Sequence, residues 1–188
     1  MQSKFFKTIL LIVALTFINT SFANDNKSTK VHLKDQNIAI SLNIPSQLKE
    51  QCSLNSCRFS ATNNPLNVYI KIIEQKQNNF QNIVSKKISE IILNPIDNSQ
   101  KDLYRNVEIL KDDSQGPEKS FEYKGVITKK DADKIYLQKM LHESFLLRKN
   151  KIIQTQCEVS HKDKSITEDK IIEIDNICQS IIDSILVN

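Results

Sequence analysis

Residues 174–186 read IDNICQSIIDSIL, and their spacing decides how the C-terminal end of the chain folds. The apolar residues of this region recur at steps of three or four, namely Ile171, Ile174, Cys178, Ile181 and Ile185. This spacing is typical of one face of an α-helix. Because a helix with one apolar face packs against another element, Cys178, in the middle of that face, is predicted to be buried.

Seven stretches upstream of this helix alternate between apolar and polar residues, as half-buried β-strands do. They are residues 37–45, 57–61, 66–74, 103–111, 119–129, 134–148 and 151–160. In the long stretch 134–148 the alternation fails near His142, which predicts a β-bulge there.

The remaining segments have other patterns. Apolar residues at 80–92 recur at helical spacing, and Asn94-Pro95 predicts the end of that helix. The capping-box pattern of residues 165–168, SITE, predicts the start of the C-terminal helix. Residues 24–30 are polar and expected to be loose, whereas residues 46–56 are expected to form a polar loop or a short helix.

The order of these elements predicts the fold class. Strands come first, then a helix, then four consecutive strands, then the last helix. The connections KKDADK (129–134) and RKNK (148–151) are short and polar, as antiparallel hairpins require. The sequence therefore predicts an α+β fold, with a largely antiparallel sheet of about six or seven strands and helices packed on it.

The N-terminal segment has the features of a secretory signal peptide. Lys4 and Lys7 precede an apolar run at 9–18, and Ser21-Phe22-Ala23 offers small residues at the positions read by a signal peptidase. A retained membrane anchor is the alternative, but the run is well short of the roughly 20 residues that span a bilayer. We therefore expect cleavage after Ala23, a single domain at 24–188, no stable membrane anchor, and a periplasmic or secreted location.

Composition excludes several classes of function. The net charge of +4 falls to +2 when residues 1–23 are removed, because that segment holds two lysines and no acidic residue. A charge so close to neutral gives no reason to expect nucleic-acid binding. The chain has two glycines, too few for a glycine-rich phosphate loop or a dinucleotide fingerprint, and no cofactor is predicted.

The four cysteines all follow Ala23. An even number of cysteines in an exported protein suggests disulfides. Cys157 falls on the inward face of the last strand, so a bond to Cys178 is favoured, and Cys52 and Cys57 flank the turn-like SLNS. Free buried thiols are one alternative, and a metal site is another, since Cys157 and His161 are four residues apart and Cys52 and Cys57 are five apart. Zinc sites usually have tighter paired spacings, so no metal is predicted.

Catalytic motifs are absent from the sequence. The three histidines, His32, His142 and His161, stand beside no G-x-S-x-G or H-E-x-x-H pattern. His142 is expected at a core edge of its strand and His161 in a solvated turn. No catalytic or cofactor-binding residue is therefore predicted, and an exported hydrolase assembled around His142 remains an alternative.

The charged turns are expected to be solvated. Asp131 and Asp133 lie in one turn and Asp112-Asp113 in a loop, with too few oxygen ligands for calcium. The basic residues Lys129-Lys130 and those at 148–151 come one strand apart, which predicts opposite ends of the sheet rather than one patch.

Three segments, together with the helix and the meander that lie between them, carry a resemblance to a known family. They are ISLNIP (40–45), NVYIKII (67–73) and IIDSILV (181–187). The chain resembles the PsbP-like superfamily, in particular its small exported bacterial members of the DcrB kind. The resemblance implies an antiparallel sheet between helices (an α/β/α sandwich), no enzymatic activity and function through protein partners. The chain differs from the DcrB kind in lacking a cysteine for lipidation.

The leading hypothesis is therefore an exported, non-catalytic domain that binds another protein. The outward face of the strand at 134–148, with Tyr136, Met140 and Phe145, is one candidate contact surface. An immunity or inhibitor protein that acts on a toxin or host enzyme is an alternative, as is the small hydrolase.

Overall fold

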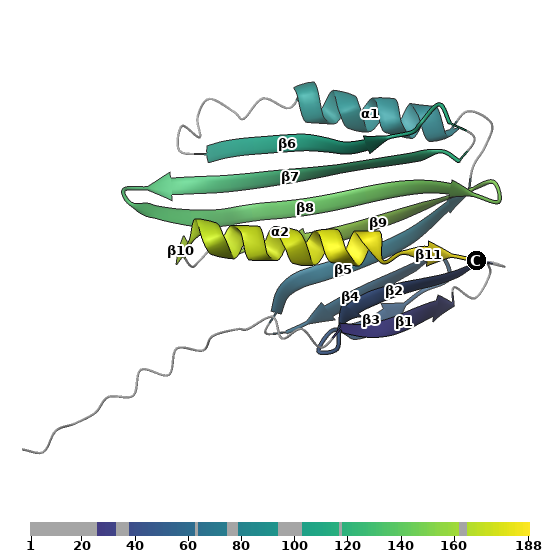
Figure 1. Cartoon of the computed structure of the whole chain (residues 1–188), viewed down its shortest axis with the longest axis horizontal. Helices are drawn as coiled ribbons and strands as arrows, with labels where there is room; N and C mark the ends of the chain where they lie inside the picture. The colour runs from purple at the N-terminus through teal and green to yellow at the C-terminus, as the bar shows by residue number, and fades with distance from the viewer. Residues whose placement is uncertain are drawn as a thin grey trace, which may run out of the picture.

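The computed structural model describes residues 26–32, 38–62, 64–74, 79–93, 103–116, 118–161 and 165–188. These residues form two helices and eleven strands in two antiparallel sheets (Figure 1). The predicted signal peptide at 1–23 lies outside the described residues. No helix among the described residues is long and apolar enough to cross a membrane.

The main sheet has eight strands, and each pairs antiparallel with its neighbours. Across the sheet the order is β3 (Lys49–Cys52), β4 (Ser56–Ala61), β5 (Asn64–Glu74), β9 (Lys151–Val159), β8 (Lys134–Arg148), β7 (Ser120–Asp131) and β6 (Leu103–Asp112), with the short β10 (Ser165–Ile166) beside β8. The predicted α+β class with a largely antiparallel sheet is confirmed. The main sheet has more strands than predicted, because β3 and β10 have no alternating pattern that would reveal them: β3 is short and polar, and β10 has two residues. β3 lies where a loop or short helix was expected.

A second, three-stranded sheet joins the two ends of the described chain. Its order is β1 (Asn26–His32), β2 (Ala39–Pro45) and β11 (Leu186–Val187). The expectation that residues 24–30 are loose is wrong for 26–30, because β1 pairs with β2 along its length and buries Val31. Sequence reasoning missed this strand because nearly all its side chains are polar and its stability comes from backbone pairing.

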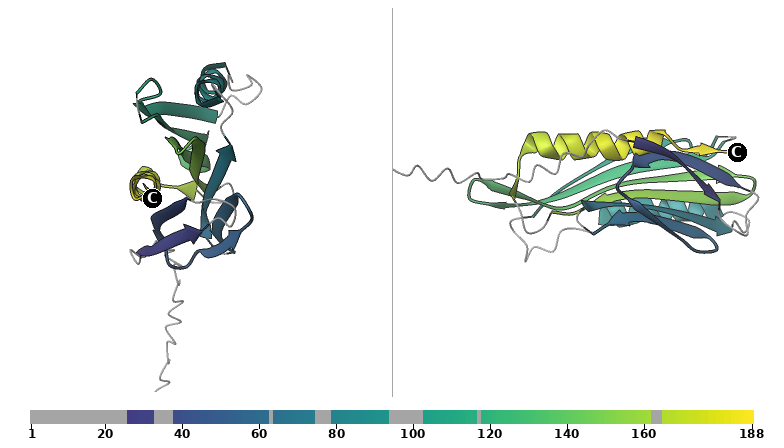
Figure 2. Two further views of the ribbon diagram at one scale, coloured as in Figure 1. Left: turned by 90° about the vertical axis from the view of Figure 1, so that its right-hand side faces the viewer. Right: turned by 90° about the horizontal axis from the view of Figure 1, so that it is seen from below.

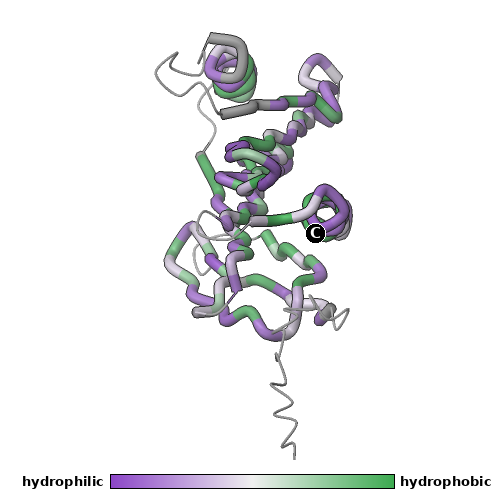
Figure 3. Tube along the Cα trace, turned by 90° about the vertical axis from the view of Figure 1, so that its left-hand side faces the viewer, coloured by the Kyte–Doolittle hydropathy of each residue, from purple (hydrophilic) through white to green (hydrophobic). Residues whose placement is uncertain are grey.

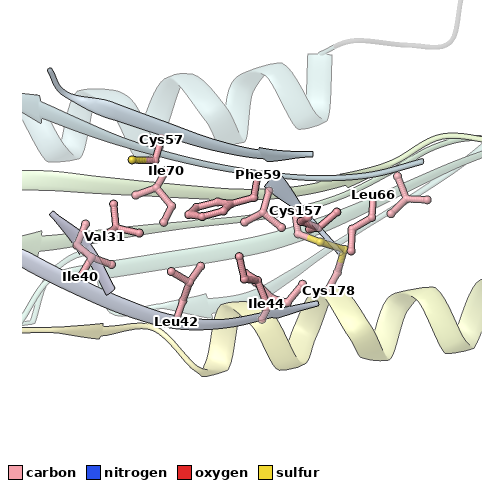
Figure 4. Packing of buried hydrophobic residues seen from close by; sticks show 14 of the residues in the cluster. Val31, Ile40, Leu42, Ile44, Cys57, Phe59, Leu66, Ile70, Cys157 and Cys178 are labelled. Atoms are coloured by element: carbon pink, nitrogen blue, oxygen red, sulfur yellow. A yellow bond between two sulfur atoms is a disulfide. The ribbon is translucent and has the colours of Figure 1, made fainter. Parts of the chain in front are cut away.

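The larger hydrophobic core fills the space between the small sheet, the main sheet and the last helix (Figure 4). The alternation in β2 places Ile40, Leu42 and Ile44 in this core, where they meet Phe59 and Leu66 of the main sheet. Hydrophobic and polar residues alternate along the strands (Figure 3). This alternation separates the core side of each strand from its outer side.

A smaller core lies on the opposite face of the main sheet, under α1 (Asn79–Leu93). Phe80 and Val84 of the helix pack there against Phe121, Phe145 and Ile152. The helix predicted at 80–92 is thus confirmed. Figure 2 shows α1 and the last helix on different sides of the main sheet.

The last helix, α2, spans Glu168–Asp183. Its N-cap is Thr167, whose hydroxyl accepts a hydrogen bond from the backbone N–H of Lys170. The predicted capping box is therefore wrong, because Ser165 belongs to β10 instead. The helix also ends before Ile185, since the chain turns there to form β11.

The predicted disulfide partners are joined in the structure. Cys157 and Cys178 form a bond with Cα atoms 5.5 Å apart, and Cys52 and Cys57 form one with Cα atoms 4.1 Å apart. Figure 4 shows the first bond between β9 and α2. The described residues contain no free cysteine.

The predicted bulge near His142 is wrong. The register shift in β8 falls between Ile127 and Thr128 of its neighbour, so the additional residue is Gln138. The alternation fails at residues 142–145 for another reason, namely that all four are buried. The strand is covered there on both faces, by α2 on one side and α1 on the other.

The covering layers differ from those of a simple α/β/α sandwich. Each face of the main sheet carries one helix, but the three-stranded sheet shares its face with α2 (Figures 1 and 2). The face occupied by α1 is covered mainly over β7, β8 and β9.

The contact surface suggested on β8 is not a surface. Met140 and Phe145 are 0% and 1% exposed, and they belong to the larger and the smaller core respectively. Only Tyr136 of that set is partly exposed. An amphipathic pattern could not distinguish an outward face from one that a helix covers.

The two disulfides are expected to stabilise the fold unequally. Loop-closure entropy predicts that C157A/C178A, which opens a separation of 21 residues, lowers the free energy of unfolding by about 3 kcal/mol. The matched variant C52A/C57A opens a separation of five and should lose about 2 kcal/mol. Urea unfolding measures both, and an equal or reversed order would contradict the prediction.

Candidate functional site

Two buried polar clusters occupy neighbouring positions on β8. His142 and Glu143 are 0% and 1% exposed. Because successive side chains of a strand point to opposite faces, His142 lies under α2 and Glu143 under α1. Buried ionisable groups often occur at functional sites, so each cluster is a candidate site.

The cluster under α2 is a chain of hydrogen bonds and ion pairs. His142 Nε2 lies 2.6 Å from Asp175 Oδ1, and Lys124 Nζ lies 3.1 Å from Asp175 Oδ2. Lys124 also contacts Glu108 at 3.3 Å. The carboxylate of Asp175 therefore joins α2 to two neighbouring strands, β7 and β8.

The position of His142 explains this geometry. In the sheet register His142 is directly opposite Lys124 on one side and Cys157 on the other. On α2, Asp175 and Cys178 are three residues apart and hence on the same face of the helix. Lys124, His142 and Cys157 thus form one row across β7, β8 and β9. This row holds α2 through the contacts of Asp175 and through the Cys157–Cys178 disulfide.

The carboxylate of Asp175 can only accept hydrogen bonds when ionised. His142 Nε2 must then carry the proton that it donates to Asp175. The other ring nitrogen, Nδ1, is buried and makes no hydrogen bond with a described residue.

The surroundings of Lys124 change the pKa of its ammonium group. Partial burial lowers its pKa, but hydrogen bonds and charge attraction to Asp175, and then to Glu108, outweigh that effect. The pKa is therefore raised from its ordinary value of 10.5. The lysine stays charged, as its contact with two carboxylates requires.

The cluster under α1 surrounds Glu143. Its carboxylate accepts hydrogen bonds from the Tyr123 hydroxyl and from the Gln154 amide. Lys87 of α1 forms an ion pair with it at 3.4 Å. All three partners donate to an ionised carboxylate, so they compensate for its burial.

Neither cluster is arranged for hydrolysis. His142 is fully enclosed, and among the described residues no serine hydroxyl donates to it. Ser144 lies two residues further along the same strand, with no recorded bond to the ring. A catalytic base has to reach its substrate, whereas both clusters are better explained as attachments that fix the helices.

The other residues singled out in the sequence do not assemble into a site. His32 lies in β1, and the backbone N–H of His161 donates to Leu137. Asp131 and Asp133 are exposed at the β7–β8 turn. The basic residues near that turn and those near the β8–β9 turn are at opposite ends of the sheet, as predicted (Figure 1).

One set of potential metal ligands occurs in the described residues, formed by Glu50, Cys52 and Cys57. Glu50 Oε1 lies 2.9 Å from Cys52 Sγ. Both sulfurs are joined in a disulfide, so neither offers the thiolate that a metal requires. The set therefore does not form a metal site in this state.

The cavity that sequence reasoning missed lies between the two sheets. It has a volume of about 190 Å³ and is lined by Lys27, Thr29, Ile44, Pro45, Ser46, Leu48, Glu50 and Phe59. These residues come from β1, β2, β3, β4 and the turn after β2. No spacing in the sequence indicated it, because it depends on how one sheet packs on the other.

No protein-family model matches the chain, and no curated protein matches it by sequence. Several solved structures have a similar fold. The cyanobacterial PsbP from Synechocystis sp. PCC 6803 aligns with 79% of this chain and 86% of its own, at 13% identity and a TM-score of 0.49. A PsbP protein, of the kind that the sequence resembles, is therefore among the structures similar to this chain.

Two further structures match at similar levels. LpqN of Mycobacterium tuberculosis, described as involved in cell envelope biogenesis, covers 88% of this chain and 92% of its own, at 10% identity and a TM-score of 0.47. The Saccharomyces cerevisiae Ran-binding protein Mog1p covers 86% and 95%, at 8% identity and a TM-score of 0.44. At these identities the likeness concerns the fold alone.

Removing Asp175 should release α2 from the sheet on one side. D175A leaves the Nε2 proton of buried His142 without an acceptor, which should cost about 1–3 kcal/mol in the free energy of unfolding. D175N keeps an acceptor oxygen and should lose less. Urea unfolding measures these values against N176A, at an exposed neighbouring position; a D175A variant as stable as N176A would refute the role.

The raised pKa of Lys124 predicts a dependence of stability on alkaline pH. A pKa that is higher in the folded chain stabilises it fully below the unfolded value, about 10.4, and this contribution is lost as pH rises through the folded pKa. K124M should therefore be less stable than the parent by about 1 kcal/mol at pH 8.

The difference between parent and K124M should shrink above about pH 10.5. Urea midpoints at several pH values would show it, with K129M, at an exposed lysine, as the control. A gap that stays constant to the highest pH at which both fold would contradict the assignment.

Proposed function

We propose that this chain is an exported, non-catalytic protein that acts by binding another protein. One observation carries the proposal: His142 and Glu143, the buried ionisable groups that could do chemistry, are enclosed and hold the two helices. A cavity between two strand edges remains accessible, and Lys27 and Glu50 are among the residues that line it.

The size of the cavity favours a protein partner over a small ligand. Pockets for drug-sized ligands are typically about 300–1,000 Å³, and this one is about 190 Å³. A cavity of this size can take one side chain of a larger partner, whose other contacts would lie on the surface around it. An inhibitor or immunity protein would be a special case of this function, with an enzyme or toxin as the partner.

Two features support export. The segment at 1–23 has the charge, apolar run and small residues of a signal peptide. The described cysteines are all paired in disulfides, and such bonds persist in oxidising compartments. Cleavage after Ala23 would leave the domain at 24–188 in the periplasm or outside the cell.

Photocrosslinking in the cells that produce the protein tests the proposal. A photoreactive amino acid would replace exposed apolar residues, one at a time, at Leu54, Ile109 and Ile172, and also Gln51. At least one position should give a discrete, light-dependent adduct with a second protein. The adduct should persist in a folded H142Q variant, because binding requires no reaction at this ring.

No adduct at any of the four positions would count against the proposal. An adduct that disappears with H142Q, while the fold and the urea midpoint are retained, would point instead to chemistry at His142.

A further inference from the structure

We propose that the free edges of β1 and β3, with the cavity between them, bind an extended acidic segment of the partner, one of whose side chains enters the cavity. This inference rests on the proposed function and specifies the surface and the chemistry of the partner.

Two strand edges are left unpaired at the same end of the molecule. β3 is the first strand of the main sheet and β1 is the first of the small sheet, so each pairs on one side only among the described residues. Both lie at the lower side of the molecule in Figure 1, where the sheets face each other. An unpaired edge presents backbone N–H and C=O groups that another strand can bond.

The cavity lies between these two edges. Lys27 and Thr29 of β1 line one side, and Leu48 and Glu50 line the other. Ile44 and Phe59 form its floor and are only 3% and 0% exposed, so most of its accessible lining is polar. A cavity of about 150 Å³ accepts a benzene-sized group, so this cavity of about 190 Å³ has room for a single side chain.

This combination matches recognition by strand addition. In that mode the main-chain hydrogen bonds supply affinity, and a pocket that takes one side chain of the added strand supplies specificity. The Cys52–Cys57 bond links β3 to β4 at directly opposed positions. The edge is thereby held in place before a partner arrives, which reduces the entropy lost on binding.

The charges on the edges determine which segments fit. β1 and β3 carry Lys27, Lys30 and Lys49 against Glu50. None of these lysines forms an ion pair with a described residue. Lysines on an edge disfavour pairing with apolar strands, because their charge would be desolvated, and they repel basic strands. They attract aspartate and glutamate, so an acidic strand is the complementary partner.

Labelled synthetic octapeptides provide a defined probe. DVEVDVEV alternates acidic and apolar residues, KVKVKVKV reverses the charge, and DVEPDVPV lacks two backbone N–H groups. Fluorescence anisotropy with the disulfide-bonded protein should show binding of the first peptide, and weakening by at least about tenfold for each of the others.

Variants of the protein locate the site. K27E/K49E should weaken binding of DVEVDVEV by about tenfold or more. The matched control K129E/K134E makes the same change of charge at the distant β7–β8 turn and should leave affinity within about twofold. Amide chemical shifts should move in β1 and β3, and circular dichroism should verify that both variants fold.

The proposal is overturned if DVEVDVEV does not bind at about 1 mM, if the lysine peptide binds equally well, or if the two double variants behave alike. Photocrosslinked adducts that survive K27E/K49E would also refute this site while leaving protein binding intact. Absence of all adducts would instead refute the proposed function itself.

Discussion

The row of residues Lys124, His142 and Cys157 across three neighbouring strands fixes the position of the last helix. Asp175 contacts the first two residues and Cys178 is bonded to the third. The helix in turn covers the larger core, on which the small sheet also packs. The contacts of Asp175 with Lys124 and His142 therefore lie beside the Cys157–Cys178 disulfide. The disulfide fixes the distance between α2 and the sheet, and the contacts of Asp175 fix the orientation of the helix.

The two faces of β8 explain why the chain contains buried ionisable groups without an active site. Residues 142–145 are covered on both sides, so a polar residue there has to find its partners in the helices. His142 finds Asp175, and Glu143 finds Lys87 together with two donors from the sheet. Such contacts fix the registry of each helix on the sheet, which an apolar interface alone specifies less sharply.

Much of the fold could be predicted from periodicity. The seven strands with alternating residues and both helices exist, and the cysteine spacing identified the pairs that the structure joins. β1, β3 and β11 could not be predicted in this way, because polar or very short strands are held by backbone pairing that leaves no pattern in the side chains. The partners of His142 and the cavity beside Phe59 depend on packing between segments far apart in the sequence, and so they were also missed.

The small sheet contains the beginning and the end of the described chain, since β2 bonds β1 on one side and β11 on the other. Asn188 and Ala39 even exchange two backbone hydrogen bonds. Contacts of such long range form late and slowly. During synthesis the N-terminal residues appear first, so this sheet cannot be completed until residues 186–188 have been made. A chaperone that prevents β1 and β2 from pairing with other strands would protect the chain until then.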